Sequence, residues 1–304
     1  MATAKSNRLT LQNSFDLAKK KSEGGNPDTG YCIDGRVYNA YMTNVEWGDF
    51  VKRMPSEIAN RFENGQGGEM KERKIGHGNN VPPKMCSCGS SSRMLYELAN
   101  SIPDFIFEYE LPTVIGGKAH LDGHKENGNI YVEAKCREIY GGKGEVSTVY
   151  DQLYEYLSST TLFRYERTEN KVRFNWGTKE IEHFDLKQML CHLLGIANHN
   201  LCNGIAPVNF LYMVYKPTPG LLSFLNENDR KRIQKIWKQE KQEAENIDFK
   251  HLYRHIILFL RDKMNVGTNI TAEQVSEMEQ SFSFLFCTQY DFKEQLTRIS
   301  DDTI

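Results

Sequence analysis

The sequence predicts an α/β fold in which helices flank a mixed β-sheet. Residues 104–111 alternate apolar and polar side chains, as a half-buried strand does. Asn127-Gly128 separates two further strand-like segments and is typical of a tight β-hairpin turn. Helical periodicity at 185–199 then precedes a buried apolar run at 208–215. The order helix, three strands, helix, strand is typical of a mixed sheet covered by helices.

The first part of the chain predicts helices and a long loop. Residues 1–30 hold a short amphipathic segment followed by a loose tail. Residues 44–64 show helical spacing of apolar side chains, and Pro55 restarts the pattern as a first-turn residue. Residues 65–88 are rich in Gly, Asn and Pro, so we expect a mobile or ligand-binding loop without a compact element.

A serine-capped helix over 90–101 leads into the strand at 104–111. The next strand follows a turn near Gly116-Gly117. A three-residue loop over 115–117 keeps the aromatic face of the first strand toward the core, and it places Glu110 opposite Asp122. We therefore prefer this odd loop to a two-residue loop.

The segment 119–137 predicts a hairpin that gathers charged groups on one face. A type I′ turn needs positive φ at both central residues, which Asn-Gly supplies. Pairing outward from Asn127-Gly128 sets Asp122 opposite Glu133. Lys135 shares the face of Glu133, because side chains alternate along a strand. The opposite, apolar face carries Ile130, Val132, Ala134 and Cys136.

The second half predicts a helix at 146–162 and a polar strand-like insertion at 163–176. Two helices over 222–265 follow the buried strand. The segment 281–290, SFSFLFCTQY, predicts an added edge strand, and a short terminal helix ends the chain.

The paired carboxylates point to metal-dependent chemistry. Like charges opposite each other destabilise a sheet, and a divalent cation between them removes that cost. Mg²⁺ uses one or two carboxylates together with water and phosphate oxygens. A lysine beside such a site can orient or deprotonate a water molecule, or offset charge on a phosphoryl transition state. Metal-assisted hydrolysis of a phosphodiester uses these parts.

Asp122, a ten-residue gap and Glu133-Ala134-Lys135 resemble the D…(E/D)xK signature of the PD-(D/E)XK nuclease superfamily. Over residues 80–216 the chain resembles a group of bacterial restriction endonucleases, although Leu121 stands where the family usually has proline. The resemblance implies a restriction-endonuclease-like fold and Mg²⁺, with Mn²⁺ as a substitute. It implies that Asp122, Glu133 and the Ala134 carbonyl bind the metal and that Lys135 positions the attacking water. The product would carry a 5′-phosphate.

Three further residues are candidates for supporting roles. Gln188 belongs to a polar stripe with His192 on the otherwise apolar helix 185–199. The resemblance suggests that Gln188 contacts a metal-bound water or the scissile region, and a solvated stripe is the alternative. Glu110 shares the face of Asp122, and Glu97 lies at the edge of a buried helix face, where it either reaches metal-bound water or is solvated.

Other patterns leave alternatives open. His120 and His124 flank Asp122, which would suit a transition metal, although contacts to phosphate or packing at the rim are the more ordinary interpretations. Cys86-x-Cys88 is half of a possible zinc site, or a pair of free thiols. The basic helix face at 230–241 is either solvated or a contact for the phosphate backbone.

Composition limits the class of protein and the cellular compartment that we expect. The chain has 304 residues and a net charge of −2, which neither announces nor excludes nucleic acid. No apolar run suits a membrane helix, and the first residues lack the apolar core of a secretory signal. Seven cysteines, an odd number without repeated spacing, indicate a reducing, cytoplasmic setting.

We therefore predict a Mg²⁺-dependent DNA endonuclease, a restriction or defence enzyme. The alternatives are a structure-selective repair or recombination nuclease of the same superfamily, and a non-catalytic DNA-binding or assembly protein. Expected partners are double-stranded DNA, a second copy of the chain in a homodimer, and a cognate DNA methyltransferase, with no membrane. The predicted organisation is an N-terminal addition at 1–85, a nuclease core at 86–220 and a helical extension at 221–304.

Overall fold

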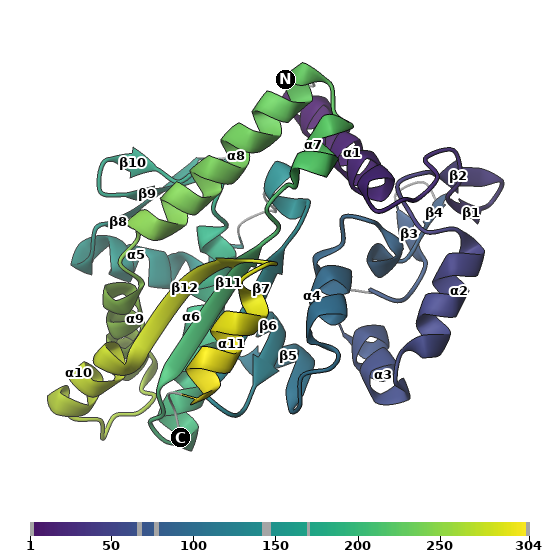
Figure 1. Ribbon diagram of the computed structural model, residues 1–304. Coiled ribbons are helices and arrows are strands. Elements are labelled where there is room, and N and C mark those ends of the chain that lie inside the picture. The colour runs from purple at the N-terminus through teal and green to yellow at the C-terminus, as the bar shows by residue number, and fades with distance from the viewer. Residues whose placement is uncertain (1–2, 66–68, 76–78, 142–146, 169–170, 302–304) are drawn as a thin grey trace.

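A five-stranded mixed sheet lies at the centre of the fold (Figure 1). The structure is a computed structural model and describes residues 3–65, 69–75, 79–141, 147–168 and 171–301. The strand order is β12-β11-β7-β6-β5, with β7, β11 and β12 parallel and the other pairs antiparallel. The strands are β5 (Phe105–Pro112), β6 (Lys118–Lys125), β7 (Ile130–Lys135), β11 (Val208–Val214) and β12 (Phe282–Thr288). The predicted mixed sheet, including the late edge strand, is confirmed.

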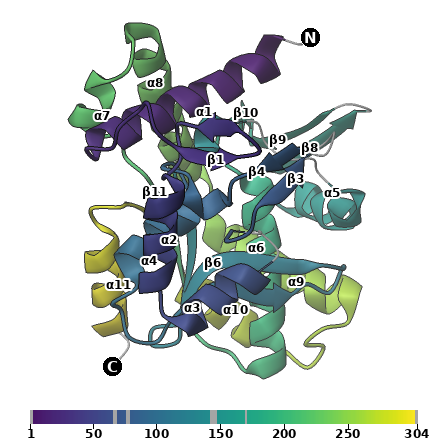
Figure 2. The same ribbon diagram turned by 90° about the vertical axis from the view of Figure 1, so that its right-hand side faces the viewer.

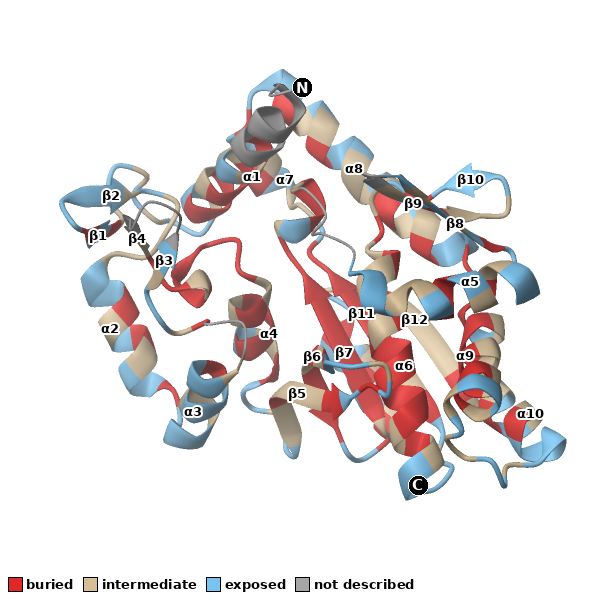
Figure 3. Ribbon diagram, turned by 180° about the vertical axis from the view of Figure 1, so that it is seen from behind, coloured by how far each residue is buried: buried red, intermediate tan, exposed pale blue. Residues whose placement is uncertain are grey.

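Helices cover both faces of this sheet. On one face α4 (Ser91–Ala99) packs on β7, and α11 (Phe292–Asp301) contacts α4 and β12. On the other face α6 (Leu186–Asn203) packs on β5 and β6, beside α9 (Phe249–Met264) and α10 (Ala272–Ser281). Seen from that side, α6 and the strands beneath it are mostly buried (Figure 3). The functional residues described below lie under α6.

The register predicted for the β6–β7 hairpin is confirmed next to the turn, but the ladder ends before the predicted pair of Asp122 with Glu133. Lys125 pairs with Ile130, and the ladder continues to Gly123 opposite Val132. The predicted type I′ turn is wrong, because positive φ occurs at Gly128 (86°) and Asn129 (43°) instead of Asn127 and Gly128. Asparagine tolerates the left-handed region. The Asn129 side chain is held there by donating to the carbonyl of Pro207 (2.7 Å).

The β5–β6 connection is an odd loop, as preferred, but it is shifted by one residue. The backbone N–H of Thr113 donates to the carbonyl of Gly117 (3.2 Å), so the loop is 114–116. This register sets Glu110 opposite His120, and the predicted pairing of Glu110 with Asp122 is wrong. Glu108 takes that position, because its neighbours Phe107 and Tyr109 pair with the neighbours of Asp122.

Side-chain alternation reverses in the middle of β6. Gly123 lies beneath Leu95 of α4, on one face of the sheet. Ala119, four residues earlier, lies against Gly195 of α6 on the other face, where a Cβ on the glycine would come within 2.7 Å of the Ala119 Cβ. Two residues four apart in a regular strand would share a face. The reversal falls where Glu108 and Asp122 leave the ladder, as at a β-bulge.

The N-terminal segment is more ordered than its composition suggests. The helix predicted over 44–64, with its restart at Pro55, is confirmed as α2 (Asn44–Arg53) and α3 (Ser56–Asn64). The region expected to be an unstructured loop holds the hairpin of β3 (Arg73–Ile75) and β4 (Asn79–Val81), although part of it lies outside the described residues. A second small hairpin, β1 (Tyr31–Ile33) with β2 (Arg36–Tyr38), precedes α2.

Helix α1 (Thr3–Ser22) is longer than predicted and lies against α7 (Pro219–Ser223) and α8 (Glu227–Asn246) (Figure 2). Its buried face carries charge. The Asp16 carboxylate pairs with Arg137. The Lys20 ammonium donates to the carbonyls of Thr29 (2.7 Å), Asn39 (3.0 Å) and Tyr41 (2.8 Å). These bonds satisfy the buried charges of side chains that the sequence pattern alone would place on the surface.

The strand-like insertion forms a second, three-stranded sheet in the order β10-β9-β8. Its strands are β8 (Phe163–Thr168), β9 (Lys171–Trp176) and β10 (Lys179–Glu180). The preceding helix is α5 (Asp151–Thr160), and its Tyr154 packs against Phe163 and Phe174 of the hairpin. The predicted helix and the strand-like character of the insertion are confirmed.

Candidate active site

The Asp122 carboxylate accepts a backbone hydrogen bond from β7 that a carbonyl of the neighbouring strand would accept in a regular sheet. The ladder between β6 and β7 ends at Gly123, and from there the Oδ2 of Asp122 accepts the N–H of Ala134 (2.7 Å). The half-buried carboxylate is therefore fixed beside Glu133 by a backbone donor. The predicted pair of Asp122 with Glu133 would come next, but the ladder ends before it and Asp122 bonds to Ala134 instead.

Glu133 is buried, with 2% of its surface exposed, and both of its oxygens have cationic or imidazole partners. Oε1 lies 2.6 Å from the Nζ of Lys135, and Oε2 lies 2.9 Å from the Nε2 of His192 on α6. Burial alone would raise the pKa of this carboxyl. Lys135 and His192 outweigh burial and hold the pKa below its ordinary value, so Glu133 is ionised.

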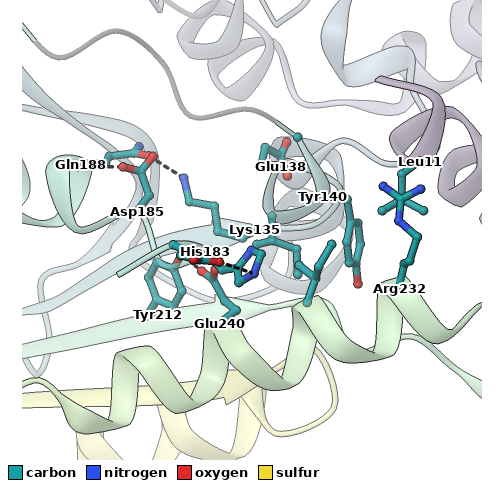
Figure 4. Close-up of a pocket in the computed structure, with 14 residues that line it drawn as sticks. Leu11, Lys135, Glu138, Tyr140, His183, Asp185, Gln188, Tyr212, Arg232 and Glu240 are labelled. Carbon is teal, nitrogen blue, oxygen red and sulfur yellow. Dashed lines mark hydrogen bonds and ion pairs between the residues drawn. The ribbon is translucent and has the colours of Figure 1, made fainter. Parts of the chain in front are cut away.

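Lys135 joins the strand to α6. Its Nζ donates to the Oε1 of Gln188 (2.5 Å; Figure 4). The same Nζ contacts Glu133. The N–H of Gln188 donates to the Oδ1 of Asp185 (3.2 Å), which caps the helix at this point. Burial would lower the pKa of Lys135, but Glu133 and Asp185 raise it well above its ordinary value. The ammonium thus stays charged and acts as a hydrogen-bond donor, not as a base.

Glu108 provides a third carboxyl group near Asp122, and it is not among the residues predicted for the site. Burial, reinforced by Glu133 and then Glu108, raises the pKa of Asp122 well above its ordinary value. Burial and the neighbouring Glu69 raise the pKa of Glu108 to about 8. Glu108 also adopts a φ of 52°, which is strained for a residue with a side chain. Strain of this kind gathers at functional sites. The sequence signal was the Glu-x-Glu alternation at 108 and 110.

Two candidates lie elsewhere. Glu110 contacts Lys118 (2.5 Å) and the Nδ1 of His120 (3.1 Å). The lysine contact lowers its pKa. Glu97 is exposed and accepts from Arg93 (2.8 Å). Neither makes a contact with Asp122, Glu133 or Lys135 in the described residues.

His192, by contrast, is a direct partner of Glu133 and had been recognised only as part of the polar stripe. Its position four residues after Gln188 places both on one helix face. That spacing was the available signal for its role.

The described residues contain no group of three or more His, Cys, Asp or Glu side chains arranged to hold a metal ion. His124 is stacked on Tyr109 (4.3 Å between ring centroids) and lies against Tyr131 (4.7 Å), and His120 contacts Glu110. The histidines therefore serve packing and an ion pair. Cys86 and Cys88 are buried free thiols.

No protein-family model matches the chain, and the searches of curated proteins and of solved structures also give no match. Within the described part of the chain, no helix is long and apolar enough to cross a membrane.

Proposed function

We propose that this protein is a Mg²⁺-dependent DNA endonuclease on a restriction-endonuclease-like fold. The observation that carries the proposal is the meeting of Asp122 with the ionised Glu133 and the charged Lys135 at a break in the β6–β7 ladder. A protein that only bound DNA would gain nothing from placing Asp122 near the buried Glu133, since neighbouring buried carboxylates cost stability. The arrangement suits a reaction in which charge develops.

The donor set fits a hard cation. Glu133 and Asp122 offer carboxylate oxygens, and each such oxygen has lone pairs beyond the one used in a hydrogen bond. Mg²⁺ is commonly held by one or two carboxylates with water and substrate phosphate completing the shell, so a closed cage of protein ligands is not needed. Burial is the main cause of the raised pKa of Asp122, and repulsion by the charges of Glu133 and Glu108 adds to it. A bound divalent cation would relieve that repulsion and polarise the phosphodiester.

Each residue then has a defined task. Asp122 and Glu133 hold the cation, with the Ala134 carbonyl as a third oxygen ligand. Lys135, kept charged by Glu133 and directed by Gln188, donates to the attacking water or to a phosphate oxygen. Because the lysine is charged and donates here, it orients the water and does not take its proton.

The partners follow from the same proposal. The substrate is double-stranded DNA, and cleavage of both strands would use a homodimer, since a two-fold axis presents one site to each strand. A restriction or defence role, with a cognate methyltransferase and a cytoplasmic location, is the biological setting that we propose.

Cleavage of unmodified plasmid and genomic DNA tests the proposal. Discrete fragments should form with Mg²⁺ or Mn²⁺ and not with EDTA. Asp122→Ala and Glu133→Ala should each abolish cleavage, while DNA binding in Ca²⁺ survives in at least one of them. Glu294→Ala is the matched control, because Glu294 is an exposed acid on α11, on the opposite face of the sheet from α6. Full cleavage by both site variants would remove the assignment of these residues.

A further inference from the structure

Strand β12 forms one end of the central sheet (Figure 1). All seven of its residues pair with β11 on one side. On the other side, none of its backbone groups from Ser283 to Cys287 bonds to another described residue. An edge of this kind presents N–H and C=O groups with which a further strand can pair.

The exposure of β12 shows that this edge is open to solvent. The four residues in its middle are all half-exposed, namely Ser283, Phe284, Leu285 and Phe286. The neighbouring strand β11 is buried except at Asn209. Successive side chains of a strand point to opposite faces of the sheet. Because residues of both faces are exposed alike, the opening lies along the edge of β12 and not over one face.

The sequence of this edge lacks the features that keep edge strands apart. Natural edge strands are protected by charged side chains, by proline or by bulges that turn the edge away. Residues 281–290 contain no charged residue, no proline and no glycine. The pairing with β11 is unbroken from Phe282 to Thr288, so β12 has no bulge. An open, regular and uncharged edge that is rich in phenylalanine is prone to pair with another strand.

The order of side chains in β12 suits a second copy of the same strand. Two identical strands related by a two-fold axis pair antiparallel with one residue opposite itself, because hydrogen-bonded and non-hydrogen-bonded positions alternate. Leu285 is the middle residue of β12, so an axis there lets all seven residues pair. Phe284 then lies opposite Phe286 of the partner subunit, and Ser283 lies opposite the partner subunit's Cys287. Aromatic side chains meet aromatic ones on one face, and small side chains meet small ones on the other.

We propose that two copies of this chain associate through β12, antiparallel about a two-fold axis at Leu285, and join their five-stranded sheets into one. The inference rests on the homodimer of the proposed function and names its contact surface, whereas the argument from β12 does not use nuclease activity. On one face of the strand, Phe284 stacks on Phe249 of α9 with 4.0 Å between ring centroids. Phe286 lies beside Trp237 of α8 on the same face. The pairing therefore extends this aromatic layer from one copy into the other.

Analytical ultracentrifugation of the whole chain in EDTA measures the association without cleavage. Wild type should be a dimer at ~10 μM. Leu285→Lys and Leu285→Glu should each weaken dimerisation by at least about a hundredfold, because the axis sets each charge opposite the same charge of the second copy. An equimolar mixture of the two variants should form a dimer again, since lysine then faces glutamate. Misfolding of either variant cannot produce that recovery.

A disulfide provides a second measurement at the same position. Directly opposed residues have Cβ atoms ~4.5–5.5 Å apart, close to the span of a disulfide. Under mild oxidation Leu285→Cys should form a covalent dimer, whereas wild type should not, although it has exposed thiols at Cys32 and Cys202. Val45→Lys is the matched control, because Val45 is an apolar residue of α2 that is 73% exposed, and it should leave the dimer unchanged.

Dimerisation that is lost in each charged variant, returns in their mixture and persists in Val45→Lys supports the interface. A wild type that stays monomeric at ~100 μM overturns it and leaves the open edge to a strand of a different protein. Undiminished dimerisation of Leu285→Lys also overturns it. If the charged variants fail to fold, the disulfide decides, and absence of a covalent Leu285→Cys dimer overturns the proposal.

DNA cleavage is measured on the same preparations. Cleavage by a monomeric wild type removes the β12 interface and keeps the nuclease activity. Dimerisation through β12 without cleavage keeps the interface and removes the proposed function.

Discussion

Replacing Glu108 by glutamine should stabilise the protein at alkaline pH and change little at acidic pH. Burial and the nearby Glu69 raise the pKa of Glu108 from 4.5 to about 8 in the folded protein. A neutral amide has the same shape and carries no charge to bury. The strained φ of 52° is shared by both side chains, so the strain cancels in the comparison.

The sign and size of the effect follow from proton linkage. Below pH 4.5 the carboxyl is protonated in both states, and its contribution to folding is intact. Between pH 4.5 and 8 only the folded state keeps the proton, so the wild-type free energy of unfolding falls by about 1.4 kcal/mol per pH unit. Above pH 8 the loss is complete, at most about 5 kcal/mol and about 2 kcal/mol if water reaches the half-buried carboxylate.

Thermal unfolding in EDTA at pH 5 and pH 9 measures this difference. For a chain of 304 residues, Glu108→Gln should unfold about 3–7 °C above wild type at pH 9 and within about 1 °C of it at pH 5. Glu110→Gln is the matched control on the same strand, because Lys118 lowers the pKa of Glu110. Glu110→Gln should leave the free energy of unfolding at pH 9 unchanged or lower it by up to about 1 kcal/mol. A Glu108→Gln protein that unfolds at or below the wild-type temperature at pH 9 would refute the reasoning.

Three further predictions concern cleavage. Lys135→Met should abolish the proposed cleavage but retain Ca²⁺-dependent DNA binding. Lys135→Arg should not restore cleavage, because a guanidinium is bulkier than the ammonium that fits between Glu133 and its neighbours. Restoration of cleavage by arginine would show that a positive charge alone suffices. His192→Phe should slow single-turnover cleavage by about tenfold or more, since it removes the partner 2.9 Å from Glu133, and an unchanged rate would make His192 a packing residue only. Glu97→Ala should leave the rate unchanged, because Glu97 is exposed and contacts Arg93; a large loss would return it to the site.

Local chemistry made the centre of the fold predictable. The Asn-Gly dipeptide and the alternation on either side of it predicted the register next to the turn, and the structure has that register from Lys125 opposite Ile130 to Gly123 opposite Val132. The helix that carries Gln188 was equally clear, because its apolar positions recur at helical spacing. These elements depend on neighbours in sequence, which a single chain reveals.

The remainder depends on contacts between distant segments. The interruption of the β5–β6 ladder at Glu108 occurs where α4 and α6 pack on opposite faces of β6. No local sequence pattern predicts it. Helix α1 was predicted too short, because Asp16 and Lys20 read as surface residues. Their partners, Arg137 and the backbone of the β1–β2 region, come from elsewhere in the chain. Buried charges are paired in space, so sequence polarity alone misplaces them.

The packing of α1 on α7 and α8 has a consequence for synthesis of the protein. Helix α1 packs on helices that are made about 200 residues later, and β7 pairs with β11 only after β11 has been made. Folds dominated by such distant contacts form slowly, and domains generally fold as units while the chain is made. Until α6 has been made, Lys135 has neither Gln188 nor His192 opposite its strand. We expect ribosome-bound chains that end before Pro219 to be digested by protease at α1, and chains that extend past Asn246 to resist. Lys135 and Glu133 therefore gain their partners on α6 only after the chain has been made as far as that helix.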